Sequence, residues 1–121
     1  MKIRIKSDSV RLRLTQSEVK SFEAEGHISA QTHFNEQVFT YQLKATDASS
    51  MTATFKDSTI TINIPNSQIQ GWYDNAIVGF DTNQILQDGT SLHLLVEKDF
   101  VCLDETVEDQ SDNFPNPRLE E

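Results

Sequence analysis

The sequence predicts an α+β fold: a mostly antiparallel sheet or barrel-like pair of sheets, with two short helices and a pseudo-twofold ββαββ duplication. One observation is an apolar pattern that recurs at a constant offset of fifty residues. The other is the alternation of apolar and polar side chains along short runs, which is typical of half-buried strands. The recurring positions are Val10, Leu12, Leu14, Val19 and Phe22 in the first copy and Ile60, Ile62, Ile64, Ile69 and Trp72 in the second.

The first copy opens with a predicted hairpin. Apolar residues alternate with cations along residues 2–6 and 10–14. Ser7 and Asp8 lie between these runs and are expected to form a two-residue turn. The pattern therefore gives each strand one apolar face for the core and one cationic face for the solvent.

A short helix is expected next. Thr15 and Glu18 match a capping box, in which each side chain satisfies a free backbone N–H group of the other residue. Gly26 suits the left-handed position that follows the last helical turn. Residues 27–34 and 38–44 then alternate again and predict a second hairpin.

The second copy repeats this order after a small polar linker at residues 45–50. Its expected elements are strands near 51–56 and 59–64, a short helix near 66–75, and strands near 77–81 and 91–98. Its second hairpin is expected to be one residue longer, because Tyr41 and Leu43 match Leu92 and Leu94 at an offset of fifty-one.

These elements predict one domain and a terminal segment. Residues 1–103 are expected to form a single α+β domain, with candidate internal repeats at 1–45 and 51–100. Residues 104–121 form an acidic C-terminal segment. Because Phe114 and the two prolines that follow it are apolar anchors, which a freely solvated tail would not need, we expect the segment to pack back on the domain.

Composition argues against several classes of protein. The 121 residues have a formal net charge of −9, and an acidic protein repels nucleic acid at long range, so nucleic acid is a disfavoured partner. A single cysteine is typical of a reducing compartment. No apolar run approaches the roughly 20 residues that a membrane helix needs, and residues 1–6 are not typical of a signal peptide. We therefore expect a cytoplasmic protein that does not enter the membrane; the sequence sets no oligomeric state.

Charge is unevenly distributed along the chain. Residues 1–20 carry six cations against two acids, whereas residues 97–121 carry nine acids against two cations. Five of the cations alternate along the first hairpin and form what we call the basic face, the candidate anion-binding or partner-binding site: Lys2, Arg4, Lys6, Arg11 and Arg13.

The two-residue turn would place like charges opposite each other on the basic face, with Arg4 facing Arg11. Facing like charges destabilise a sheet, whereas the second copy has a favourable pair, Thr54 facing Thr61, at these positions. A cation cluster of this kind needs an anion, and three sources remain open. Carboxylates of the same chain are the favoured source, and we expect Glu97, Asp99 and the acids between 104 and 112 to satisfy Arg4, Arg11 and Arg13. The face could instead be solvated only, or it could bind an external anion.

The favoured function is a small cytosolic, non-enzymatic binding or accessory module, whose partner is an unknown protein or a small anionic ligand. The alternative is an enzyme acting on a phosphorylated small molecule, with charge from Arg4, Arg11 and Arg13 and a metal held by acidic residues of the tail. No catalytic residue, metal site or cofactor is predicted. His27 and His33 share a strand face but lie about 20 Å apart at the usual strand rise, so they cannot hold one zinc ion.

Several distinctive motifs lie near the two ends of the chain. They include Met1-Lys2-Ile3-Arg4-Ile5-Lys6, Arg11-Leu12-Arg13-Leu14-Thr15, Leu94-Leu95-Val96-Glu97-Lys98-Asp99-Phe100 and Asn113-Phe114-Pro115-Asn116-Pro117. Together they resemble a family of small uncharacterised bacterial proteins, a domain of unknown function, and this resemblance implies no catalytic residue. The alternating cations are also similar to the basic strands of triphosphate tunnel enzymes. Those enzymes begin with alternating glutamates before a lysine, and residues 2–6 contain none.

Overall fold

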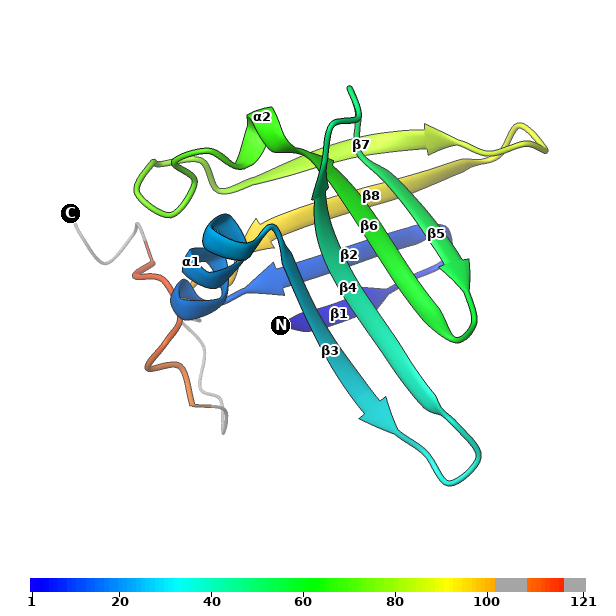
Figure 1. Ribbon diagram of the computed structural model, residues 1–121, viewed down its shortest axis with the longest axis horizontal. Coiled ribbons are helices and arrows are strands. Elements are labelled where there is room, and N and C mark those ends of the chain that lie inside the picture. The colour runs from blue at the N-terminus through cyan, green and yellow to red at the C-terminus, as the bar shows by residue number, and fades with distance from the viewer. Residues whose placement is uncertain (102–108, 117–121) are drawn as a thin grey trace.

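The computed structural model describes residues 1–101 and 109–116 (Figure 1). Ten helices and strands follow one another in these residues: β1 (Lys2–Ile5), β2 (Ser9–Leu14), α1 (Gln16–Glu25), β3 (His27–His33), β4 (Val38–Thr46), β5 (Thr52–Lys56), β6 (Thr59–Pro65), α2 (Asn66–Ile69), β7 (Gly79–Ile85) and β8 (Ser91–Lys98).

The strands form two four-stranded mixed sheets, which confirms the predicted α+β class with two short helices. Sheet A has the order β1-β2-β8-β7, and sheet B has the order β3-β4-β6-β5. Each sheet joins two antiparallel hairpins through a parallel central pair, β2 with β8 and β4 with β6. Strands β1 to β4 belong to the first copy and correspond in order to β5 to β8 of the second. Replacing each strand of sheet A by its counterpart gives the strand order of sheet B, as a pseudo-twofold duplication requires.

The equivalence of the last strands differs from the sequence-based expectation. In the parallel pairs, Leu12 lies beside Val96 and Ile62 lies beside Leu43. Leu43 therefore corresponds to Val96, at an offset of fifty-three, and its predicted match to Leu94 is wrong. The loop between β7 and β8 (residues 86–90) has one more residue than the loop between β3 and β4 (residues 34–37). The second copy also has two more residues before β7 than the first copy has before β3. An alternating pattern alone cannot reveal a shift of two residues, because such a shift keeps every side chain on its face.

The second helix is shorter than predicted, since α2 ends at Ile69 and residues up to 75 form turns. Gly71 has a φ of 76°, in the left-handed region, and here the chain leaves the helical path. Trp72 nevertheless reaches the core, where it is fully buried and lies edge-on to Phe80 at 5.1 Å. Its indole N–H donates to the Ile77 carbonyl oxygen at 2.8 Å. The second copy thus fills the core position of Phe22 from a turn.

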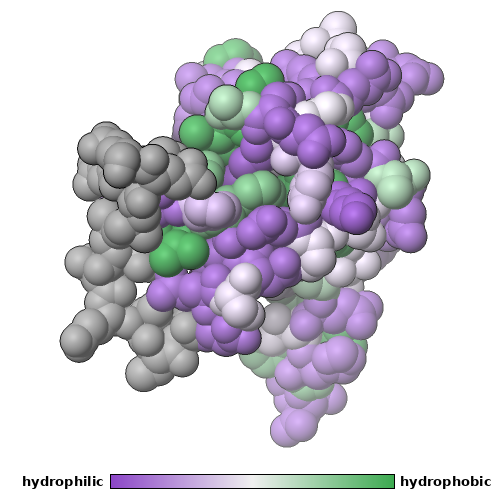
Figure 2. All heavy atoms as spheres, turned by 90° about the vertical axis from the view of Figure 1, so that its left-hand side faces the viewer, coloured by the Kyte–Doolittle hydropathy of each residue, from purple (hydrophilic) through white to green (hydrophobic). Residues whose placement is uncertain are grey.

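The core lies between the two sheets, whose strands cross in Figure 1. Its fully buried apolar side chains come from both copies: Leu12, Leu14, Val19, Phe22, Leu43, Ile62, Ile64, Trp72, Leu94 and Val96. The helices lie at one end of the sheets and the hairpin turns at the other. The end that carries α1 presents mainly hydrophilic residues with small apolar patches between them (Figure 2).

The described part of the C-terminal segment contacts this same end. Phe114 is 7% exposed and forms a bridge with Phe100, whose ring lies 5.9 Å away. The Phe114 N–H donates to the carbonyl oxygen of Asp99 at 2.8 Å. The Tyr73 ring lies 6.4 Å from that of Phe114, and the Lys98 Nζ lies 5.1 Å from the ring centre. The packing and backbone pairing of Phe114 thus hold the segment against the residues that follow β8.

Polar contacts join the segment to the start of α1. The Gln16 N–H donates to the Asp112 carbonyl oxygen, and the Gln16 side-chain amide donates to the Asn113 carbonyl oxygen, each at 2.9 Å. The Asp112 carboxylate accepts from the hydroxyl and N–H of Ser17. Residues 102–108 and 117–121, which include Cys102, lie outside the described residues.

Candidate anion-binding face

The basic face lies on the outer side of sheet A. Val10, Leu12 and Leu14 of β2 are buried between the sheets, so the alternate residues Arg11 and Arg13 project outward. The register of β1 with β2 places Arg4 opposite Arg11 and Lys2 opposite Arg13, as the two-residue turn predicted. The second copy pairs Thr54 with Thr61 at the equivalent position.

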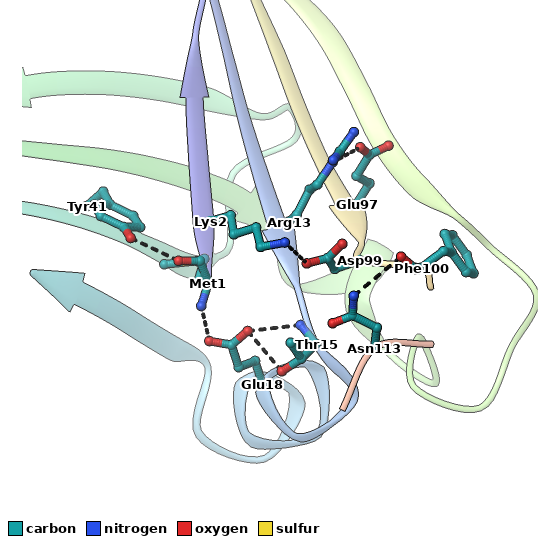
Figure 3. A network of polar contacts seen from close by, with 10 residues as sticks. All are labelled: Met1, Lys2, Arg13, Thr15, Glu18, Tyr41, Glu97, Asp99, Phe100 and Asn113. Atoms are coloured by element: carbon teal, nitrogen blue, oxygen red, sulfur yellow. Dashed lines mark hydrogen bonds and ion pairs between the residues drawn. The ribbon is translucent and has the colours of Figure 1, made fainter. Parts of the chain in front are cut away.

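One part of the basic face is paired with acidic residues of the same chain. The parallel register brings Glu97 of β8 beside Arg13, whose Nε donates to its carboxylate at 2.9 Å (Figure 3). The same carboxylate oxygen lies 3.5 Å from the Nε of Arg11. At the end of β8, Asp99 is almost fully buried, and its Oδ2 lies 3.2 Å from the Lys2 Nζ. In the described part of the chain this oxygen accepts no well-aligned hydrogen bond, so Lys2 balances its charge.

Glu97 owes its position to a glycine on the neighbouring strand. Gly79 of β7 pairs with Glu97, and a Cβ added there would lie 2.7 Å from the Cβ of Glu97 and 2.5 Å from the Val96 carbonyl oxygen. Neither distance is sterically allowed, so only glycine lets the two strands approach this closely. This role of Gly79 could not be predicted from the sequence, because the contact depends on the register of two strands.

The other part of the basic face is open. Glu97 pairs with Arg11 and Arg13 as expected, but no carboxylate of the described residues satisfies Arg4, contrary to the expectation for this residue. Arg4, Lys6, Ser9 and Arg11 line a depression of about 240 Å³, which we call the basic hollow. Within residues 1–101 and 109–116, no carboxylate lies within 4 Å of the side-chain nitrogens of Arg4 or Lys6. Neighbouring cationic side chains that have no carboxylate partner can bind a phosphate or carboxylate group. Arginine can do so through two parallel hydrogen bonds.

His93 lies in the row of residues next to the hollow. It is beside Ser9 in the parallel register of β2 and β8, and its Nδ1 lies 3.1 Å from the Asn83 side-chain oxygen. This contact holds the imidazole ring against β7.

The start of β1 is fixed by a polar network that also caps α1. Glu18 accepts hydrogen bonds from the N–H and the hydroxyl of Thr15, each at 2.9 Å, and from the amino group of Met1. This is the predicted capping box, extended by the amino group. The Tyr41 hydroxyl of β4 donates to the Met1 carbonyl oxygen at 2.9 Å. These contacts hold β1 against α1 and sheet B, and so fix the strand that carries Lys2 and Arg4.

Two pKa values follow from this network. Burial by itself would raise the pKa of the Glu18 carboxyl. The hydrogen bonds from the Met1 amino group and Thr15, with the charge of that amino group, outweigh burial and lower this pKa below its ordinary value. The pKa of Tyr41 is raised by burial and by the nearby negative charge of Glu18.

The described acids of the C-terminal segment contact residues outside the basic face. Hydrogen bonds from Ser17 and Thr15 lower the pKa of Asp112, and hydrogen bonds from Ser111 lower the pKa of Asp109. Asp104, Glu105 and Glu108, which were further candidates for neutralising the cations, lie outside the described residues.

The described residues contain neither a metal-binding cluster nor a membrane-spanning helix. No group of three or more His, Cys, Asp or Glu side chains among residues 1–101 and 109–116 is arranged to hold a metal ion. None of the helices in this part of the chain combines the length and the apolar character needed to span a bilayer.

Comparison with known protein families shows which family the chain belongs to. The model of a family of unknown function, DUF7009, matches residues 1–118. No curated protein and no solved structure is significantly similar to the chain.

Proposed function

We propose, for a chain that belongs to this family of unknown function, that the basic hollow binds an anionic group, a phosphate or a carboxylate, and that the protein is a non-enzymatic binding module. The observation that carries the proposal is the facing pair of Arg4 and Arg11 beside Lys6. Acids compensate Arg13 and Lys2, whereas none in the described residues reaches Arg4 or Lys6.

The second copy supports a functional origin of this charge. It builds an equivalent hairpin with Thr54 opposite Thr61, so the fold does not require arginines at these positions. A facing threonine pair stabilises a sheet by about 0.2–1 kcal/mol, whereas facing arginines destabilise it. A cluster that lowers stability without serving the core is typical of a binding site.

The overall charge narrows the kind of ligand. Because the chain has a net charge of −9, its long-range field repels polyanions, and attraction is confined to the neighbourhood of the basic face. Salt screens such local attraction beyond about 8 Å at physiological ionic strength. A single phosphate or carboxylate group, free or carried by a partner, therefore fits the hollow better than a nucleic acid does.

Titration of the protein with inorganic phosphate and with citrate, followed by NMR, tests the proposal. We expect shifts at Arg4, Lys6 and Arg11, saturating with ligand and weakening with added sodium chloride. The double variant Arg4→Thr/Arg11→Thr copies the second hairpin and should lose these shifts. It should be at least as stable as the natural chain, because the repulsion between the two arginines is gone.

The duplication supplies a matched control. Lys6 and Lys56 occupy equivalent positions in the two hairpins, so Lys6→Ser should weaken phosphate binding while Lys56→Ser should not. Equal effects of the two lysine variants would show that the anions respond to net charge and not to the hollow. Unchanged binding by the double variant would show that the anions bind elsewhere on the protein.

A further inference from the structure

The outer edge of β1 has unpaired backbone groups. The Lys6 N–H donates to the Ser9 carbonyl oxygen at 3.0 Å, which fixes the alternation of the ladder. Arg4 therefore bonds to β2, and the peptide groups of Ile3 and Ile5 point away from it. β1 is an edge strand of sheet A, and within the described parts of the chain no partner accepts from the N–H of Ile3 or Ile5.

The equivalent edge in the second copy is closed by a side chain. Ala53 of β5 corresponds to Ile3, and its N–H donates to the side-chain oxygen of Gln84 at 2.8 Å. Gln84 pairs with Leu92 in the same way that Thr32 pairs with Phe39, so Thr32 holds the position of Gln84 in the first copy. A threonine side chain is shorter, and the edge of β1 lacks this cap.

Apolar surface accompanies the open edge. Ile5 is 55% exposed although it is on the inner face of the hairpin, beside the buried Val10. Strands β3 and β4 continue past β1 in Figure 1. On their inner face Phe39 and Tyr41 are only half-buried, and the Tyr41 hydroxyl contacts the start of β1. A further strand next to β1 would cover these side chains.

Charge decides which kind of strand fits. Arg4 projects from the outer face of β1, and Lys6 follows directly after the end of this strand. Neither has a carboxylate partner in the described residues. A second copy of this chain, paired edge to edge through β1, would bring its own cations next to these, and like charges on adjacent strands repel. A strand with acids on its outer face would complement them.

We propose that β1 accepts a fifth strand of sheet A, an extended segment of a partner protein in which acidic residues alternate with apolar ones. Its acids bind Arg4 and Lys6 in the basic hollow, its apolar side chains cover Ile5 and the half-buried aromatic residues, and its backbone pairs with Ile3 and Ile5. This mode of recognition is strand addition at a sheet edge. The inference rests on the proposed function, because it names the carrier of the anionic group.

The probe is a capped peptide of alternating glutamate and valine, about eight residues long, which is within the usual length of a strand. We expect it to bind the natural chain more tightly than citrate does. Hydrogen exchange of the Ile3 and Ile5 amides should slow when the peptide binds and should not change with citrate. A peptide of the same sequence, N-methylated on every second residue, should lose this advantage.

The variant Thr32→Gln transfers the cap of the second copy to the first. It should weaken peptide binding about tenfold, a loss of about 1.4 kcal/mol, and leave phosphate and citrate binding unchanged because every cation remains. Strand addition would be overturned if Thr32→Gln bound the peptide as tightly as the natural chain does, and if the natural chain bound the N-methylated peptide as tightly as the unmodified one. The anion site would stand in that case. Failure of peptide, phosphate and citrate alike would overturn both proposals. A natural chain that dimerises, when Thr32→Gln is monomeric, would show that the occupant is a second copy.

Discussion

Single carboxylates set how the charge of the basic face is divided. Glu97 lies between Arg11 and Arg13 and is closer to the latter, and it keeps this place because Gly79 has no side chain. Arg11 is the residue of the basic hollow that Glu97 contacts. Arg11 therefore belongs both to the paired part of the face and to the open part, and Arg4 belongs to the open part only.

Glu18 makes the stability of the protein depend on acid pH. Its pKa in the folded chain is lowered below the ordinary value of 4.5. A carboxyl with a depressed folded pKa contributes stability above the unfolded value, and this contribution is lost as the pH falls through the folded value. We expect the variant Glu18→Gln to be less stable than the natural chain at neutral pH and to approach it in acid. Urea unfolding curves measured between pH 7 and acid would test this, and parallel stability profiles for the two proteins would contradict it.

At the scale of elements, local signals were the most predictive. The capping box, the left-handed Gly26 and the two-residue turn each depend on neighbours in sequence, and the structure has all three. The predicted length of α2 was wrong. Ile69 and Trp72 have helical spacing in the sequence, but the chain leaves the helix before Gly71. Alternation identifies the face of a strand and not its neighbour, so it could not predict the parallel central pairs or the open edge of β1.

The C-terminal segment acts as an element of its own through Phe114. Replacing it by alanine removes a side chain that is 7% exposed and packs against Phe100 and Tyr73. We expect Phe114→Ala to lower the free energy of unfolding by roughly 1.5–3 kcal/mol. Thermal melting would measure the loss, with Phe34→Ala as the control, because Phe34 is 60% exposed and should have little effect. Equal melting temperatures for the Phe114 variant and the natural chain would mean that the segment adds nothing to stability.

At the scale of the whole molecule, the two copies are interlocked and not side by side. Each sheet takes one hairpin from each copy, and both central pairs, β2 with β8 and β4 with β6, join the copies. The repeat was visible in the sequence because its apolar skeleton is preserved. The exchange of hairpins was not, since it depends on which strands pair across the linker. Only this exchange brings Glu97 from the second copy to the arginines of the first.

The interlocked sheets predict that neither half of the chain folds by itself. A break between residues 48 and 49 lies in the exposed linker and leaves every strand intact. The fragments 1–48 and 49–121 should each be unfolded, because each lacks a partner for the central strand of both sheets. Mixed in equal amounts they should assemble, and the fluorescence of Trp72, the single tryptophan, should shift to the blue as it becomes fully buried. Circular dichroism and size-exclusion chromatography would follow the assembly. A native-like spectrum from either fragment alone would show that a copy can complete its own core, and that the duplication joined two units already able to fold.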